Sequence, residues 1–417
     1  MIETALLLAA LTRLRALRPH RFTHRFFDVI AAAGERRCGR RLWPWVAGLG
    51  LLLLAGLYAC PATRPAALGK FYVLLASHPF AVDKNVVGFR ILTPLISWAV
   101  GLRGDLLIVT NLVFAALLLG MAYRWFAARC ARPGDALLAT LALTYSLVTL
   151  TTVYYGGYTD SLTYVLLFAM WWWRRRRALF HLFFLLGLLN RESVAFLVPW
   201  FAYLTLREVK PWWRAALDLA LGFGAAFGLY FLFRAWISQG QQIKYTAGYY
   251  LNPLAADPLY WIRKSLSFWW LGWFSVFKLL WVFPVAAGVA AWRAGERQLV
   301  YSMLLLTACS FAQMAIAFDS SRMLTMGFLV MVLALEYLLR PAAGDAPVEG
   351  AAGPDRGEPG GAADASGPVA ESGVRRWAHW VLLANLFVPQ LFTAGVIVEQ
   401  MYSPLARLLL GLAGAKM

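Results

Sequence analysis

Long, nearly uncharged apolar runs are the feature that most constrains how this chain can fold. They recur from residue 42 almost to the C-terminus, and about 20 consecutive apolar residues let a helix cross a bilayer. Hydrophobic residues make up 61% of the chain and charged residues 14%, whereas soluble domains carry about 25% charged residues. The sequence therefore predicts an all-α, polytopic transmembrane helix bundle. It excludes a soluble enzyme, a secreted disulfide scaffold and a nucleic-acid-binding domain.

The apolar runs predict about ten to thirteen spans, since several of them are short or adjoin one another. The candidate spans lie near 42–60, 105–123, 135–153, 160–173, 178–190, 192–206, 214–237, 266–292, 298–317, 322–339 and 377–398. The segment 86–102 is ambiguous because it is short and contains Arg90 and Pro94.

The basic residues orient the bundle. The net charge is +18, and arginines and lysines form short clusters between apolar runs, as the positive-inside rule describes. Residues 1–41 contain nine arginines, which predicts a cytoplasmic N-terminus with a basic interfacial helix and an anchor span at 42–60. All other basic clusters fall on the cytoplasmic side only if 86–102 does not cross, so we expect it to be a re-entrant or interfacial element in the first outer loop. Those clusters are Arg124/Arg129/Arg132, Arg174–Arg177, Arg207/Lys210/Arg214, Arg293/Arg297 and Arg340.

Composition divides the chain into four parts. Residues 1–41 form the basic N-terminal segment, 42–340 the transmembrane core, 341–374 a disordered cytoplasmic linker, and 375–417 a last transmembrane segment and tail. The linker is rich in Gly, Ala, Pro, Asp and Glu, which cannot bury a core. The chain has no internal repeat and no matched pair of interrupted helices, so the usual pointer to an inverted-repeat transporter is missing.

Scarce acidic residues converge on the predicted outer face. Asp83, Asp160, Glu192, Asp257 and Asp319 all come out on this side, and four of them lie in short motifs. Ionisable groups at membrane depth usually face a cavity or a partner. The motifs are His78–Asn85 with Asp83 and Lys84, Tyr154–Asp160, Asn190–Ser193 with Arg191 and Glu192, and Asp319–Arg322; Asp257 lies on the same side.

Each motif also has a structural interpretation. Arg191 and Glu192 could form an ion pair that joins two helix ends. Asp319 and Arg322 have i, i+3 spacing and could form a local salt bridge at a helix start. Asp160 could cap the helix that follows it, and Asp83 could be a solvated loop acid. Convergence of all four on one face favours a functional site.

Other chemical signals are weak. The five histidines and four cysteines are scattered, so neither a metal centre nor a disulfide framework is predicted. GxSxG, HExxH and P-loop motifs are absent from the sequence, which argues against an ATP-driven machine. The outer loop 238–265 carries several tyrosines that either stack on a sugar or sit at the lipid headgroups.

Acids and arginines at the outer face of a lipid-embedded cavity suit sugar transfer. A carboxylate can take the proton from an acceptor hydroxyl as it attacks a sugar carbon. Arginines can hold the phosphate of the donor and stabilise the charge on the leaving group. No nucleotide is available outside the cytoplasm, so a polyprenyl-phosphate sugar is the donor that meets these demands.

Over about residues 42–340 these motifs resemble the polytopic GT-C-type membrane glycosyltransferases, particularly divergent bacterial members. The resemblance rests on Asp83, Phe89–Pro94, Tyr158–Ser161, Asn190–Glu192 and Asp319–Arg322. It implies an inverting enzyme of the bacterial inner membrane whose extracytoplasmic site takes a polyprenyl-phosphate sugar donor and a lipid or glycan acceptor. Asp83 matches the general base, and Arg90, Arg191 and Arg322 match ligands of the donor phosphate. We include Lys84, Tyr158, Asp160, Glu192 and Asp319 in the same substrate site. The first loop has one acid in place of the usual pair, so metal use has no support in the sequence. A large soluble C-terminal domain is missing, which leaves acceptor recognition to loop 238–265.

Three other functions compete with this interpretation. A transporter or lipid-linked-sugar flippase also explains ion pairs within a membrane, although Asp218 and Glu336, the candidate acids of the cytoplasmic half, lie near basic inner ends. An O-antigen-type polymerase or ligase would also use outer-face arginines. A structural subunit of an envelope-assembly complex would use the pairs only to fasten helices.

Overall fold

The protein was analysed as a computed structural model. The structure describes residues 20–59, 64–65, 68–80, 86–130, 132–239, 252–253, 255–257, 259–260, 263, 268–315, 320–340, 371–394 and 397–401. The predicted interfacial helix near residues 4–11, almost all of the predicted linker 341–374 and most of the loop 238–265 lie outside these residues.

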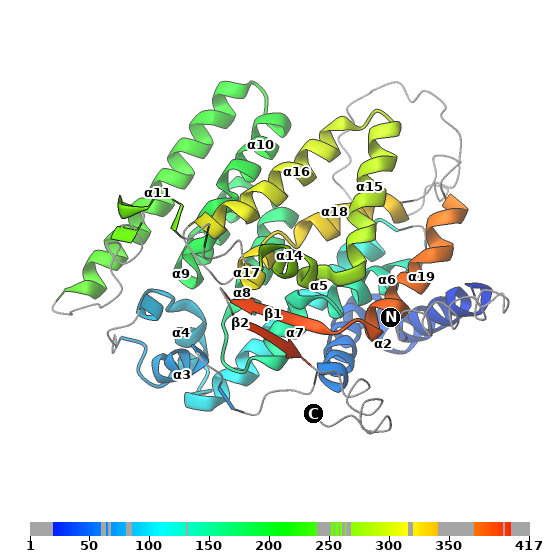
Figure 1. Cartoon of the computed structure of the whole chain (residues 1–417), viewed down its shortest axis with the longest axis horizontal. Helices are drawn as coiled ribbons and strands as arrows, with labels where there is room; N and C mark the ends of the chain where they lie inside the picture. Colours follow the sequence, from blue (N-terminus) through cyan, green and yellow to red (C-terminus); the bar gives the residue numbers. More distant parts are fainter. Residues whose placement is uncertain are drawn as a thin grey trace.

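The described chain is almost entirely helical (Figure 1). In chain order the elements are α2 (His20–Ala59), α3 (Gly69–Ser77), η1 (Val86–Phe89), α4 (Leu92–Ala99), η2 (Gly104–Leu106), α5 (Leu107–Ala127), α6 (Pro133–Thr144), α7 (Leu147–Tyr154), α8 (Asp160–Trp172), α9 (Arg177–Asn190), η3 (Glu192–Leu197), α10 (Val198–Glu208), α11 (Trp212–Ser238), α14 (Trp269–Phe277), η4 (Lys278–Trp281), α15 (Val282–Arg293), α16 (Arg297–Ala312), η5 (Gln313–Ala315), α17 (Ser320–Thr325), α18 (Leu329–Leu339), α19 (Glu371–Phe387), β1 (Gln390–Ala394) and β2 (Ile397–Met401).

The all-α, polytopic fold class is confirmed, with fewer long spans than the sequence suggested. Five stretches of the described residues are long and apolar enough to cross a membrane, and α6 with α7, bent by 53°, makes a sixth if the pair is one span. The five are Phe26–Ala59, Gly104–Ala127, Trp212–Ser238, Trp269–Arg293 and Ser321–Leu339. Three further predicted spans are instead the short helices α8, α9 and α10. These reach only about 16–21 Å, against a hydrocarbon core of about 30 Å.

The spans differ in what surrounds them. In the most apolar window of Ser321–Leu339, 83% of the residues are buried inside the bundle, against 22% for α11. The exposed face of α11 carries large apolar side chains such as Leu221, Phe231 and Leu232. A face of this kind is stable only against lipid or another apolar surface. We conclude that α18 is central and that α11 lies at the edge of the bundle.

Ion pairs join the helix ends that the sequence assigned to the cytoplasmic side. We call Arg129, Arg174, Arg177 and Arg340 the basic belt. Its pairs are Arg129–Glu336 at 3.1 Å, Arg174–Glu208 at 2.7 Å, Arg177–Asp218 at 2.5 Å and Arg340–Glu296 at 2.5 Å. Helix α8 starts at Asp160 and ends just before this belt, so Asp160 lies about 20 Å away along the helix. Asp160 and the arginines of the basic belt thus lie at opposite ends of α8.

The first loop contains no long helix in its described part. Within 86–102 the structure has η1 and the eight-residue helix α4, which is only about 12 Å long. This length agrees with the prediction that 86–102 does not cross. Arg90 stands between η1 and α4, at a break in the helical backbone.

The C-terminal part differs from the predicted last span 377–398. Helix α19 ends at Phe387, and an antiparallel hairpin of β1 and β2 follows. Pro389 follows the end of α19, where a missing N–H and the restricted residue before it disfavour more helix. The hairpin lies beside α14 and α17 (Figure 1), and the Ser321 side chain exchanges hydrogen bonds with the Thr393 backbone at 3.1 and 3.0 Å.

Candidate functional site

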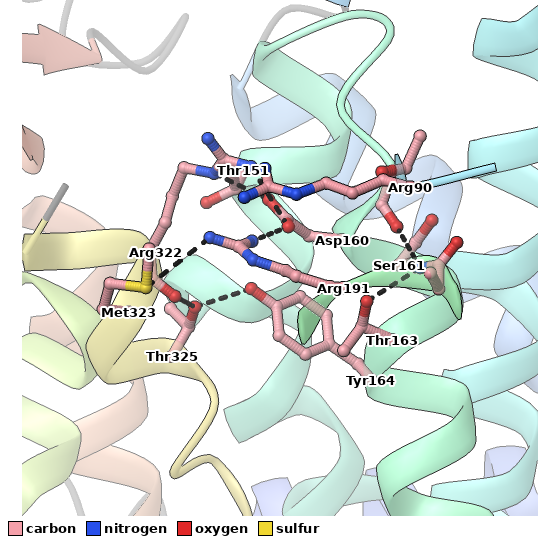
Figure 2. A network of polar contacts seen from close by, with 12 residues as sticks. Arg90, Thr151, Asp160, Ser161, Thr163, Tyr164, Arg191, Arg322, Met323 and Thr325 are labelled. Atoms are coloured by element: carbon pink, nitrogen blue, oxygen red, sulfur yellow. Dashed lines mark hydrogen bonds and ion pairs between the residues drawn. The ribbon is translucent and has the colours of Figure 1, made fainter. Parts of the chain in front are cut away.

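Six of the nine predicted site residues lie together at one end of the bundle. They are Arg90, Tyr158, Asp160, Arg191, Glu192 and Arg322, and Figure 2 labels the three arginines beside Asp160. The charged members stand at helix breaks or helix starts: before α4, at the start of α8, between α9 and η3, and in the short helix α17. Broken backbone at membrane depth is tolerated where it is buried in protein or lines a cavity. The breaks therefore bring charged side chains to a shared interior position.

Asp160 is the centre of a buried ion triad. Its carboxylate accepts hydrogen bonds from Arg322, with Nε–Oδ2 at 2.7 Å and Nη2–Oδ1 at 3.1 Å, and it also pairs with Nη1 of Arg191. All three side chains are 2% exposed. A charge buried this deeply is stable only when it is paired and hydrogen-bonded. Both arginines therefore depend on the single carboxylate of Asp160.

A second pair lies closer to the surface. Arg90 binds Glu192 in a bidentate manner, with Nε–Oε2 at 3.0 Å and Nη2–Oε1 at 2.6 Å, and donates to the Tyr72 hydroxyl at 3.1 Å. Glu192 is 33% exposed on its side chain, and Arg90 is 10% exposed. Glu192 lies in none of the candidate spans. Burial alone would raise its pKa, but Arg90 lowers the pKa of Glu192 to about 2. The carboxylate is therefore ionised at neutral pH.

The described cluster carries more positive than negative charge. Three guanidinium groups face two carboxylates, which leaves one net positive charge among these residues. Asp319 lies outside the described residues and is only three positions from Arg322. Guanidinium forks match the oxygens of carboxylates and phosphates. Chemically, the cluster suits an anion that brings oxygen atoms to one or more of the arginines.

Aromatic and hydroxyl groups fix the arginine of α17. The guanidinium of Arg322 lies 4.0 Å from the centre of the Tyr158 ring, a cation–π contact. Thr325 Oγ1 donates to the Arg322 carbonyl at 2.6 Å, and the Tyr164 hydroxyl lies 2.6 Å from the same Thr325 oxygen (Figure 2). These contacts attach α17 to α8. Tyr158 therefore supports the cluster by positioning Arg322.

Asn190 links three elements of the site, although no role was predicted for this residue from the sequence. Its side-chain oxygen accepts from the backbone N and the hydroxyl of Thr93 at 3.1 and 2.6 Å. Its amide nitrogen donates to the Thr159 carbonyl at 3.0 Å and to the Thr163 hydroxyl at 2.8 Å. Asn190 thus ties α4 and α8 to the end of α9. The sequence did contain a signal for this role, because Asn190 is a polar residue at the end of an apolar run and directly precedes Arg191.

The pairings differ from the local ones considered in the sequence. Arg191 and Glu192 are neighbours but pair with Asp160 and Arg90 respectively. Arg322 pairs with Asp160 across 162 positions. Asp160 starts α8, yet the carboxylate of this residue binds two arginines. Asp257 forms a separate pair with Arg263 at 3.3 Å and is not part of the cluster.

Three predicted site residues, Asp83, Lys84 and Asp319, lie outside the described residues. Tyr72 was not predicted; it follows Phe71 in an apolar stretch that gave no signal. The part of the chain that the structure describes contains no group of three or more His, Cys, Asp or Glu side chains suited to a metal ion.

No protein family, curated protein or solved structure matches the chain. The fold and hydropathy define the class: the chain is a multi-pass α-helical membrane protein. Its distinguishing feature is the cluster of three arginines and two carboxylates, with Asp160 buried at its centre, at the end opposite the basic belt.

Proposed function

We propose that this protein is a membrane glycosyltransferase that moves a sugar from a polyprenyl-phosphate donor to a lipid or glycan acceptor at the extracytoplasmic face of the bacterial inner membrane. The observation that carries the proposal is the arginine-rich cluster, in which three segments far apart in the chain place guanidinium groups around two carboxylates. The resemblance of its motifs to GT-C-type enzymes supports the same reaction.

The arginines would bind the donor phosphate. Arg90 is the most accessible of the three, and Glu192 and Tyr72 already hold its guanidinium in a fixed orientation. A fixed cation needs no reorganisation when negative charge grows on the departing phosphate. Arg191 and Arg322 lie deeper, where they add positive potential and depend on Asp160.

The two kinds of carboxylate would have different roles. With a pKa of about 2, Glu192 is a weak base at neutral pH, so it suits hydrogen bonds to sugar hydroxyls. We assign the general base to Asp83, which matches the catalytic first-loop acid of the GT-C-type enzymes that these motifs resemble. The acceptor oxygen attacks the anomeric carbon and gives its proton to Asp83. The bond from that carbon to the phosphate oxygen breaks, and its electron pair leaves with the phosphate.

The test is sugar transfer by the purified full-length protein in liposomes that contain a radiolabelled polyprenyl-phosphate-sugar pool and membrane lipid acceptors. We expect wild type to label an acceptor, Asp83→Asn to lose at least about a hundredfold of that rate, and Arg132→Gln at the other end of the bundle to keep it. If wild type consumes no donor, the enzyme proposal fails. If Asp83→Asn transfers sugar at the wild-type rate, the assignment of the base fails.

Transport of a lipid-linked sugar is the second candidate, since the deeply buried triad also resembles the ion pairs of membrane pathways. Against it, Asp218 and Glu336 pair with Arg177 and Arg129 of the basic belt and do not connect the two ends. In the same liposomes, a flippase would move the labelled donor between leaflets without breaking its sugar–phosphate bond.

A further inference from the structure

A large apolar groove opens between α2, α6 and α19, outside the candidate site. Its volume is about 800 Å³, and residues such as Trp43, Gly50, Leu54, Leu141 and Leu383 line it. Its lining includes none of the charged residues of the arginine cluster. The groove is therefore separate from the place that the donor phosphate would occupy at Arg90.

The walls of the groove suit a hydrocarbon chain. Helix α2 lines it with Phe26, Phe27 and Ile30 and again from Trp43 to Leu54, and this second stretch alone is about 17 Å long at 1.5 Å per residue. An acyl chain that lies along these apolar walls is removed from water or from looser lipid contacts, which supplies affinity.

A positive rim flanks one end of the groove. Helix α2 bends at Gly39, whose φ of 75° and ψ of 151° are not helical. A side chain at Gly34 would clash with the Trp43 ring. In a straight helix, residues nine positions apart would be separated by about 13.5 Å, so the two halves of α2 fold back on each other.

Four exposed arginines occupy this bend, directly before Trp43. They are Arg36, Arg37, Arg40 and Arg41. Glu35 pairs with Arg40 at 3.7 Å, which leaves a net positive charge on residues 35–41. Basic clusters at the end of a membrane helix attract anionic lipids, and each basic residue contributes about fivefold in binding.

We propose that this groove is a binding site for an anionic phospholipid. The acyl chain lies between α2, α6 and α19, and the phosphate lies at the arginines of the bend. The apolar walls supply affinity for the chain, whereas the arginines select a negative headgroup. The site is separate from the arginine cluster at Asp160 and does not depend on the proposed transfer reaction.

Gly50 offers a clean test. It lines the groove, and a Cβ there would meet nothing within 4 Å, so Gly50→Phe puts a ring into the groove without a backbone clash. Gly224 on α11 is the matched control, since it is also exposed with nothing within 4 Å of its Cβ and does not line the groove.

The probe is phosphatidylglycerol with a photoreactive diazirine on one acyl chain, compared with phosphatidylcholine that carries the same chain. Each is added to the full-length protein in detergent micelles, and crosslinked peptides are quantified by mass spectrometry. We expect phosphatidylglycerol to label α2 and α19 at least about tenfold more than phosphatidylcholine. Gly50→Phe should lower this labelling about tenfold, and Gly224→Phe should leave it unchanged.

A second variant, with all four arginines of the bend changed to Gln, alters only exposed side chains and tests the headgroup. It should reduce phosphatidylglycerol labelling to the phosphatidylcholine level. Equal labelling by the two wild-type probes, or wild-type labelling of Gly50→Phe, overturns the proposal. Displacement by unlabelled polyprenyl phosphate at lower concentration than by unlabelled phosphatidylglycerol would assign the groove to a prenyl lipid and also overturn it.

Discussion

Asp160→Asn removes the carboxylate that faces both Arg191 and Arg322, and keeps the side-chain shape. Two guanidinium groups that are 2% exposed would then face a neutral amide. Breaking one buried ion pair costs about 3–5 kcal/mol because a charge is left without a partner. Asp160 serves two arginines, so we expect the upper end of that range, about 5 kcal/mol.

Asp218→Asn is a matched control at the other end of the bundle. Asp218 also pairs with an arginine, Arg177, but the two side chains are 31% and 21% exposed. Water screens this pair, so its loss should cost only about 1 kcal/mol. The expected difference of about 4 kcal/mol corresponds to about a thousandfold in the unfolding equilibrium.

The measurement is unfolding of the purified protein in mixed micelles as the SDS fraction rises, followed by tryptophan fluorescence. Trp125 and Trp200 are fully buried, so opening of the core changes their contribution to the signal of the chain's 19 tryptophans. A double variant, Asp160→Asn with Arg322→Gln, removes one of the stranded cations. It should be more stable than the sum of the single effects by about 0.5–3 kcal/mol. Equal midpoints for Asp160→Asn and Asp218→Asn would refute the idea that the triad is held by this carboxylate.

Two further predictions concern the rest of the site. The pKa of Glu192 is lowered in the folded protein to about 2, so the stability it contributes is present above its usual pKa and is lost as the pH falls from about 4.5 to about 2. Glu192→Gln should flatten the acid side of a stability profile measured across this interval, and an unchanged profile would contradict the Arg90 pairing. Asn190→Ala leaves the hydroxyls of Thr93 and Thr163 without a partner they use now and should cost about 1–3 kcal/mol in the SDS titration. If the Asn190→Ala, Thr93→Val double variant loses no more stability than Asn190→Ala alone, the two side chains act as a pair. Strictly additive losses from the two substitutions would count against the pairing.

The apolar runs were sufficient to predict a helical membrane protein, because the backbone must satisfy its own hydrogen bonds in lipid. Acidic residues are scarce outside 341–374, so the position of each one was informative about a candidate site. The number of long spans was not readable from composition. The segments 178–190 and 192–206 look alike as apolar runs, but the structure ends α9 at Asn190 because the polar side chains that follow find partners inside the bundle.

The sequence alone determined that Asp160, Arg191, Glu192 and Arg322 would lie toward the same end, since charge patterns orient the helices. Only the tertiary structure decided which arginine pairs with which carboxylate. Arg191 has an extended backbone, with φ −161° and ψ 115°, and successive side chains of an extended chain point in opposite directions. Its neighbour Glu192 is thus directed to Arg90, and Arg191 to Asp160. Arg191 and Glu192 are neighbours in sequence but belong to different ion pairs. The direction of each side chain selects its partner, and the partners come from helices that only the folded bundle brings together.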